Sequence, residues 1–229
     1  MNLLKSITCI CALSAAIIFS GCGVDNFVYL YPVTQLLNNP SPNDPTLNFF
    51  SFRTADKNNQ DSSGDYFKGY EIYYQIYNSE SVLISNKAEI DTYNQKNPTT
   101  SFSYLVNSKK YSRMVHVGRT TEIPLIQGTD DNQDVIIRLT KSGDEYPARF
   151  SVVTSENLGD PRRSLNEGTS FLPFDYTNIT ISDKDVIYTS SASVDKWFVQ
   201  AYVVTYGYDE SYKSYYSQIF SLNYVAISK

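Results

Sequence analysis

The chain has 229 residues, with 19 lysines and arginines against 24 aspartates and glutamates, and its formal net charge is −5. A net acidic chain does not favour the basic surface that nucleic-acid binding requires. The same charge argues against electrostatic binding to anionic lipid. The length is sufficient for one large domain or two small ones.

The first 21 residues have the pattern of an export signal. Lys5 is the one charge at the start, and an uncharged apolar run follows over residues 6–19. A basic start followed by such a run is typical of a signal peptide. A membrane-spanning helix needs about 20 apolar residues, so a retained span is the weaker alternative. The sequence therefore predicts a cleaved leader over residues 1–21.

Cys22 follows two small residues, Ser20 and Gly21, directly after the apolar run. This arrangement resembles the lipobox of bacterial lipoproteins in the loose form found in spirochaetes, with Phe19 where the family usually has leucine. The resemblance implies that the leader is cut before Cys22 and that its sulfur carries fatty chains. It also implies a protein held on a membrane outside the cytosol, at the outer membrane or the periplasmic face. A chance cysteine in a plain secretory signal is the alternative.

Behind the cysteine the sequence predicts a tether over residues 22–40 and one domain over residues 41–229. Because Cys9 and Cys11 belong to the leader, no internal disulfide is expected in the domain. Alternation of apolar and polar residues predicts strands at 46–54, 66–77, 111–118, 121–127, 134–140, 148–155, 179–188, 196–208 and 216–228. The other predicted segments are a polar loop at 55–65, short helices at 85–97 (capped by Ser85) and 98–108, and an irregular stretch at 156–178.

Tyrosine is unusually common, with 20 residues against 12 phenylalanines and 1 tryptophan. Tyrosine suits a half-buried pleated surface, and it is also enriched at recognition surfaces. In the strand predicted at 66–77, alternate residues from Tyr70 to Ile76 form an apolar face. Those from Glu71 to Tyr77 form an amphipathic face. A β-rich fold with tyrosine on both faces is the preferred interpretation.

The two long alternating segments at 196–208 and 216–228 are joined by a polar loop and predict a β-hairpin. Together with "TLNFFSFRT" and "FKGYEIYYQIY", they resemble strands of a fibronectin type III or related immunoglobulin-like domain. "WFVQAYVVTYG" is similar to that family's Y-x-V-x-A strand, with Trp197 in place of tyrosine. The resemblance implies a mainly all-β fold, an antiparallel β-sandwich with a large insertion at roughly residues 80–195. A sandwich of another topology is the alternative.

The sequence contains no recognisable catalytic motif. His116 is the one histidine and lies in a predicted strand, so neither a zinc-binding H-E-x-x-H nor a supported triad is present. Asp130, Asp131 and Asp134 gather the oxygen ligands that calcium prefers, but the helix–loop–helix calcium spacing is missing. A solvated turn is the preferred interpretation, and no metal or other cofactor is predicted.

The sequence thus predicts a lipid-anchored, non-catalytic module of the cell envelope, with a protein or glycan ligand or a structural role. Nucleic acid is not expected as a partner. The alternative is a lipid-anchored hydrolase of envelope polysaccharide or another substrate outside the cytosol, which needs paired carboxylates roughly 5 to 10 Å apart. A deep pocket with converging acids favours the hydrolase, whereas a flat or convex aromatic patch favours the binder. The binding candidates are aromatic residues expected to be exposed near loops or on the third strand: Tyr73, Tyr77, Tyr208 and Tyr212.

Overall fold

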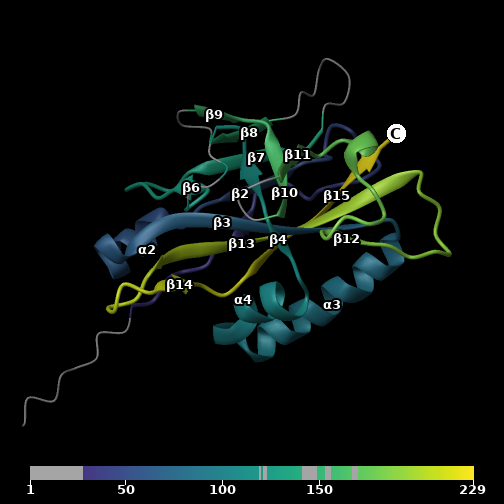
Figure 1. The fold of residues 1–229 in the computed structure, drawn as a ribbon. Coiled ribbons are helices and arrows are strands. Elements are labelled where there is room, and N and C mark those ends of the chain that lie inside the picture. The colour runs from purple at the N-terminus through teal and green to yellow at the C-terminus, as the bar shows by residue number, and fades with distance from the viewer. Residues whose placement is uncertain (1–27, 119, 121–122, 141–148, 153–155, 167–169) are drawn as a thin grey trace, which may run out of the picture.

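The computed structural model describes residues 28–118, 120, 123–140, 149–152, 156–166 and 170–229 (Figure 1). The predicted leader and Cys22 lie outside these residues. Strands predominate and form three sheets of seven, five and three strands, with almost all pairings antiparallel. The strands are β1 (Gln35–Leu36), β2 (Phe50–Arg53), β3 (Phe67–Tyr77), β4 (Ser112–Arg113), β5 (Val115–His116), β6 (Ile126–Gln127), β7 (Asp134–Arg138), β8 (Arg149–Val152), β9 (Glu156–Gly159), β10 (Pro161–Asn166), β11 (Ser170–Pro173), β12 (Val186–Ile187), β13 (Lys196–Tyr208), β14 (Ser214–Tyr216) and β15 (Phe220–Ser228). The helices and helical turns are α2 (Asp56–Ser63), η1 (Gly64–Tyr66), α3 (Glu80–Lys96), η2 (Pro98–Thr100), α4 (Ser101–Ser103), η3 (Tyr104–Ser108) and η4 (Tyr176–Asn178).

The long strands β3, β13 and β15 form the centre of the seven-stranded sheet (Figure 1). β13 pairs antiparallel with β3 along nearly its whole length, and it pairs antiparallel with β15 on its other side. The hairpin predicted from residues 196–208 and 216–228 is therefore confirmed, and the short strand β14 pairs with the far end of β13. The other edge of β3 pairs with β4 and β6 and, in parallel, with β12. None of the helices in the described part of the chain has the length and apolar character needed to cross a bilayer.

The main core lies between this sheet and the five-stranded sheet, whose order is β1-β2-β7-β8-β9. Alternate residues of β3 point into the core, as the period-two pattern of the sequence predicts. Side chains from β2 and β7 of the second sheet complete the cluster. The members contributed by β3, β2 and β7 are Tyr70, Ile72, Tyr74, Ile76, Phe50, Phe52, Val135 and Ile137.

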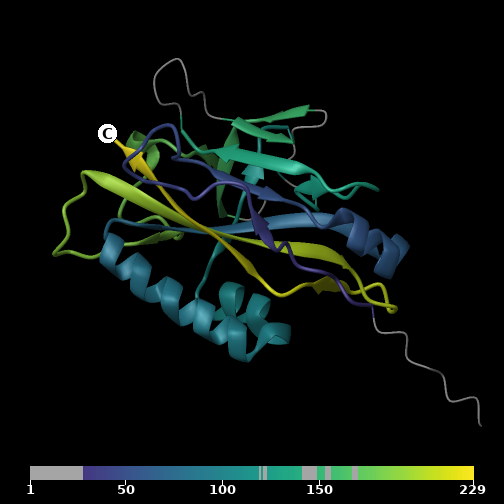
Figure 2. The same cartoon turned by 180° about the vertical axis from the view of Figure 1, so that it is seen from behind.

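The opposite face of the seven-stranded sheet is covered by α3, α4 and η3, which lie below the sheet in Figure 1 and again in the reverse view of Figure 2. Ile90 of α3 and Leu105 of η3 are fully buried there. Ser79 caps α3, because its hydroxyl accepts a hydrogen bond from the Val82 N–H at 3.5 Å. The helix therefore begins at Glu80, earlier than the sequence predicted.

The polar stretch at residues 55–65, predicted to be a loop, contains helix α2. Asn59 of this helix is fully buried. Its side-chain amide accepts a hydrogen bond from the Tyr31 N–H at 2.8 Å and donates one to the Tyr31 carbonyl at 3.1 Å. Hydrogen bonds to a remote segment, and not an apolar face, hold this helix in place.

The first described residues are part of the fold. Leu30 and Val33 are 2% and 1% exposed and belong to the main core, and β1 pairs with β2. The Thr205 hydroxyl of the central strand β13 donates a hydrogen bond to the Tyr31 carbonyl at 2.6 Å. Part of the segment predicted as tether, from residue 28 onward, is therefore fastened to the sheet by apolar side chains and strand pairing.

The three-stranded sheet, in the order β11-β10-β5, is joined to β3 by a buried ion cluster. Arg163 of β10 is fully buried and donates to both carboxylate oxygens of Asp185, at 2.9 and 2.6 Å, and to Asp183 at 2.6 Å. The Tyr74 hydroxyl of β3 donates to the same Asp185 at 2.7 Å. Residues 156–178, predicted to be irregular, thus contain three strands: β9 pairs with the neighbouring β8, β10 and β11 pair with each other, and β10 also pairs with the distant β5.

Candidate functional site

The four tyrosines predicted to bind a ligand divide between the interior and the surface. Tyr73 and Tyr77 are 7% and 0% exposed, so their predicted exposure is wrong. The helices beneath the sheet cover that face, and Phe102 of α4 packs edge-on against Tyr73 with ring centroids 5.2 Å apart. Tyr208 is half-buried, whereas Tyr212 is 76% exposed. A binding role for the two surface tyrosines stays a prediction.

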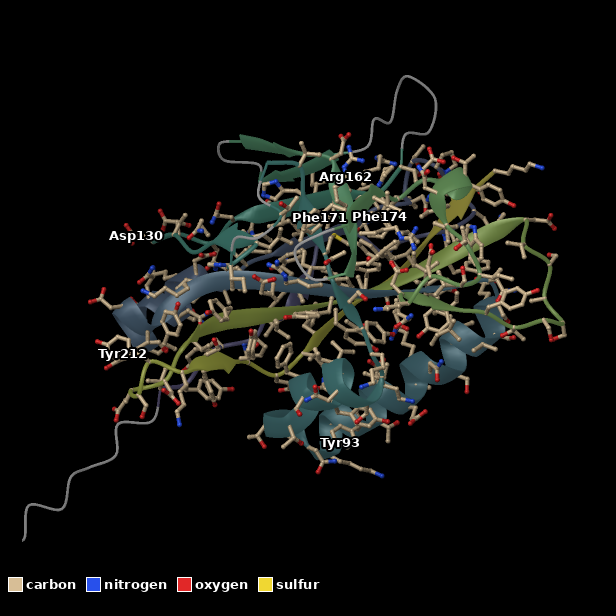
Figure 3. All side chains as sticks on the ribbon, in the orientation of Figure 1. Tyr93, Asp130, Arg162, Phe171, Phe174 and Tyr212 are labelled. Atoms are coloured by element: carbon tan, nitrogen blue, oxygen red, sulfur yellow. The ribbon has the colours of Figure 1, made fainter. Side chains whose placement is uncertain are left out.

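Figure 3 shows Tyr212 at one end of the central sheet. Tyr208 is the last residue of β13 at the same end, and further tyrosines lie nearby. The rings of Tyr66 and Tyr212 lie 6.2 Å apart, and the Lys68 ammonium lies 5.9 Å from the centre of the Tyr208 ring. The first described residues reach the same end, because the Ser63 hydroxyl at the end of α2 donates to the Tyr29 carbonyl at 2.7 Å. We call this group the tyrosine tip; it consists of Tyr29, Tyr31, Tyr66, Tyr208 and Tyr212.

The turn between β13 and β14 holds Tyr212 in a conformation that bulky residues rarely adopt. Its φ of 56° lies in the left-handed region. The Asp209 carboxylate fixes the turn, since it accepts hydrogen bonds from the N–H groups of Ser211 and Lys213 at 2.8 and 2.9 Å. The turn thus keeps an aromatic ring in solvent at a position where glycine or asparagine is favoured.

A groove of about 470 Å³ lies between α3, the segment that includes β1, and the start of β15; these elements adjoin in the reverse view of Figure 2. Ligand pockets in proteins span about 300 to 1,000 Å³, so the groove has room for a small molecule. No sequence signal marks it, because its lining comes from three separate segments of ordinary composition. The lining residues are Pro32, Val33, Thr34, Leu36, Asp91, Asn94, Gln95, Gln218, Ile219, Phe220 and Ser221.

Asp91 is the one carboxylate among these lining residues. Its Oδ1 accepts a hydrogen bond from the Tyr202 hydroxyl at 3.0 Å, and its Oδ2 lies 2.6 Å from the Lys87 ammonium. Both oxygens are therefore already paired with groups of the protein. A second acid, which the hydrolase alternative requires, is not present among the described residues that line the groove.

A chain of buried hydrogen bonds supports Asp91 from beneath. The Tyr202 hydroxyl accepts a hydrogen bond from the side-chain Nε2 of Gln200 at 2.9 Å, and the Tyr111 hydroxyl donates one to the side-chain Oε1 of Gln200 at 2.7 Å. Tyr77 continues the chain, with its hydroxyl 3.2 Å from that of Tyr111. Burial raises the pKa of Tyr77 to about 12, so its phenol is neutral at physiological pH. These hydrogen bonds hold the groove residue Asp91 in place from the sheet beneath it, and Tyr77 therefore has a structural position.

The three acids considered as weak calcium ligands are not arranged as one site. Asp134 forms a two-point ion pair with Arg53, at 2.6 and 2.9 Å, and this hydrogen bonding lowers the pKa of Asp134. Asp130 and Asp131 lie exposed on the preceding turn. Within the described chain, no three metal-binding side chains come close enough to hold an ion.

Two further titratable residues are buried away from the groove. His116 lies in β5, as the sequence predicted for a sheet residue, with Nδ1 2.9 Å from the Val117 carbonyl. Glu71 of β3 is fully buried, accepts a hydrogen bond from the Leu125 N–H at 2.9 Å, and lies 3.6 Å from the Arg113 guanidinium. Burial raises the pKa of Glu71 to about 7. Glu71 was not among the predicted site residues, although an acid inside a long apolar strand is a signal visible in the sequence.

Comparison of the chain with protein-family models, with curated proteins and with solved structures finds no match.

Proposed function

We propose that this chain is a lipid-anchored protein of a bacterial cell envelope, and that it binds a ligand in the groove beside α3 without catalysing a reaction. The observation that carries the binding role is the lining of the groove, which combines amide and hydroxyl groups with a single carboxylate paired on both oxygens. The anchor rests on the lipobox-like residues 19–22.

The lining favours a saccharide as ligand. Two side-chain amides, on Gln95 and Gln218, offer both donors and acceptors to ligand hydroxyls, whereas the Asn94 amide already donates to the Ile219 carbonyl at 3.0 Å. Apolar groups of Leu36 and Phe220 lie in the same lining and suit the C–H faces of a sugar ring. A soluble fragment of envelope polysaccharide has this alternation of hydroxyl and C–H surface.

We further infer that the domain is a sandwich of the fibronectin type III or immunoglobulin-like kind with a large insertion. The strand order supports this, because β1, β2 and β7 are neighbours in one sheet and β3, β13 and β15 are neighbours in the other. Such sandwiches serve many unrelated functions, so the proposed function depends on the groove and not on the fold.

Calorimetric titration of soluble envelope-polysaccharide fragments tests the binding role. The protein for this test is the mature chain carrying Cys22→Ala, which stays in solution. Replacing both Gln95 and Gln218 with alanine removes two hydrogen-bonding side chains, so we expect affinity to fall about 5- to 50-fold. Gln127→Ala, an exposed glutamine on β6, is the matched control and leaves affinity unchanged.

Turnover of the fragments by the unmodified chain decides against this proposal in favour of the hydrolase. Binding that is unaffected by the double glutamine variant places the ligand elsewhere and contradicts the groove assignment. For the anchor, mass spectrometry of the natural product is the direct test: we expect the leader to be cut and residue 22 to carry fatty chains. Unmodified Cys22 in the mature protein contradicts the anchor.

A further inference from the structure

The tyrosine tip lies where the described chain begins. Tyr29 and Tyr31 are 53% and 39% exposed, and their rings contact each other edge-on at 4.8 Å. Tyr29 lies beside the end of α2, and Leu30 packs against Gly207 at the end of β13. The tip is therefore the part of the described fold to which Cys22 is connected by the fewest residues.

The connection is short. Five residues lie between Cys22 and Val28 in the sequence, and an extended chain gains at most about 3.6 Å per residue, so Val28 stays within about 20 Å of Cys22 in any conformation. Strand β13 has 13 residues and spans roughly 40 Å from this end of the sheet to the other. An anchor at Cys22 thus holds the tip near the membrane, while the far end of the sheet lies beyond its reach.

We propose that the tyrosine tip rests on the headgroup region of the membrane that holds the anchor. This inference rests on the lipid anchor of the proposed function. Tyrosine is enriched at membrane–water interfaces because its ring is apolar and its hydroxyl is polar. The exposed, left-handed Tyr212 fits the same role, because the turn holds its ring outward and away from the core.

Charge around the tip indicates which lipid surface is preferred. The flanking side chains carry both signs, and acids are in excess over bases. Contact therefore depends on the tyrosine rings, and we expect it to be stronger on zwitterionic lipid than on anionic lipid. The acids beside these tyrosines are Asp65, Asp209 and Glu210, and the bases are Lys68 and Lys213.

A single fluorescent label at each end of the sheet tests the proposal in the acylated full-length product. Ser211→Cys places a label on the exposed turn of the tip, and Ser191→Cys places one on an exposed turn at the far end of β3. With Cys22 acylated and the leader removed, each introduced thiol is unique. Both proteins are reconstituted into phosphatidylcholine vesicles and, separately, into vesicles containing phosphatidylglycerol, and iodide quenching of the label is measured.

We expect the label at residue 211 to be shielded from iodide and its emission shifted to the blue, with the label at residue 191 fully quenched. Adding Tyr29→Ser and Tyr212→Asn, both at exposed positions, removes the shielding at residue 211 without unfolding the chain. Phosphatidylglycerol is expected to weaken the shielding.

Three outcomes overturn the inference. Equal quenching at both positions in protein whose Cys22 is acylated by mass spectrometry refutes the tip contact and leaves the anchor intact. Shielding that survives loss of both tyrosines refutes their role in the contact. A bare Cys22 in the same preparation refutes the anchor of the proposed function, and this inference with it.

Discussion

Replacing Glu71 tests how much a buried carboxylate costs the stability of this fold. The residue has no exposed surface and lies on β3, where its carboxylate accepts one N–H and faces the Arg113 guanidinium at 3.6 Å. Burial raises the pKa of Glu71 from 4.5 to about 7 despite these two partners, which both act to lower the pKa. Glu71→Gln removes the titration and keeps an acceptor for the Leu125 N–H.

The pKa shift of Glu71 determines how the unfolding free energy changes with pH. One pKa unit corresponds to about 1.4 kcal/mol, so the shift amounts to roughly 3 kcal/mol of unfolding free energy. Because the folded pKa is raised, this contribution is fully present below about pH 4.5 and is lost as the pH rises through 7. Wild type and Glu71→Gln are therefore expected to be about equally stable near pH 5, with the variant more stable by up to about 3 kcal/mol near pH 8.

Urea unfolding of the mature Cys22→Ala chain, followed by circular dichroism between pH 5 and 8.5, measures this difference. Other buried groups titrate equally in both proteins, so the difference between the two curves isolates Glu71. Parallel pH profiles for wild type and variant refute the reasoning, because the charge of Glu71 then costs the folded state nothing.

Three further substitutions test the packing. Gly69→Ala is expected to cost about 2–3 kcal/mol in urea unfolding, because the new Cβ collides with the Ile126 carbonyl, and an unchanged midpoint contradicts the close approach of β6. Tyr212→Asn is expected to raise the unfolding free energy by about 1 kcal/mol, and with it the thermal midpoint, because asparagine tolerates a positive φ. A lower thermal midpoint contradicts the strained turn. Asp185→Ala leaves Arg163 buried without its two-point partner and is expected to cost about 3–5 kcal/mol, and a loss below about 1 kcal/mol argues against the buried ion cluster.

The strands that cross the molecule were predictable because their pattern is local. Residues 66–77 and 196–208 alternate clearly, and one face of each must be buried, so the pattern alone fixes which side chains enter the core. Short strands such as β10 were missed. β10 pairs with the adjacent β11, but it is fixed to the rest of the fold by β5 and by the pairing of Arg163 with Asp185, and these remote contacts leave no periodic signal in the sequence.

The length of α3 and the presence of the groove could not be predicted from the sequence. α3 buries Leu83 and Ile90 as its two fully covered apolar side chains, which is too sparse a stripe to predict a helix of 17 residues. Without a helix of this length over the sheet, the alternation in residues 66–77 predicts exposed positions for Tyr73 and Tyr77, which the helix in fact covers. The groove was equally unpredictable, since its amides come together only when α3 packs beside the segment that leads into β15.

The bond between Thr205 and the Tyr31 carbonyl has a mechanical consequence. Tension on Val28 first meets the hydrogen bonds between the Tyr29 carbonyl and the end of α2, and it then reaches this bond to β13, which has neighbouring strands on both sides. The load is then shared between two rows of interstrand hydrogen bonds instead of peeling away a single edge. The start of the described fold is thus fastened to an interior strand, which cannot leave the sheet without breaking the pairings on both of its sides.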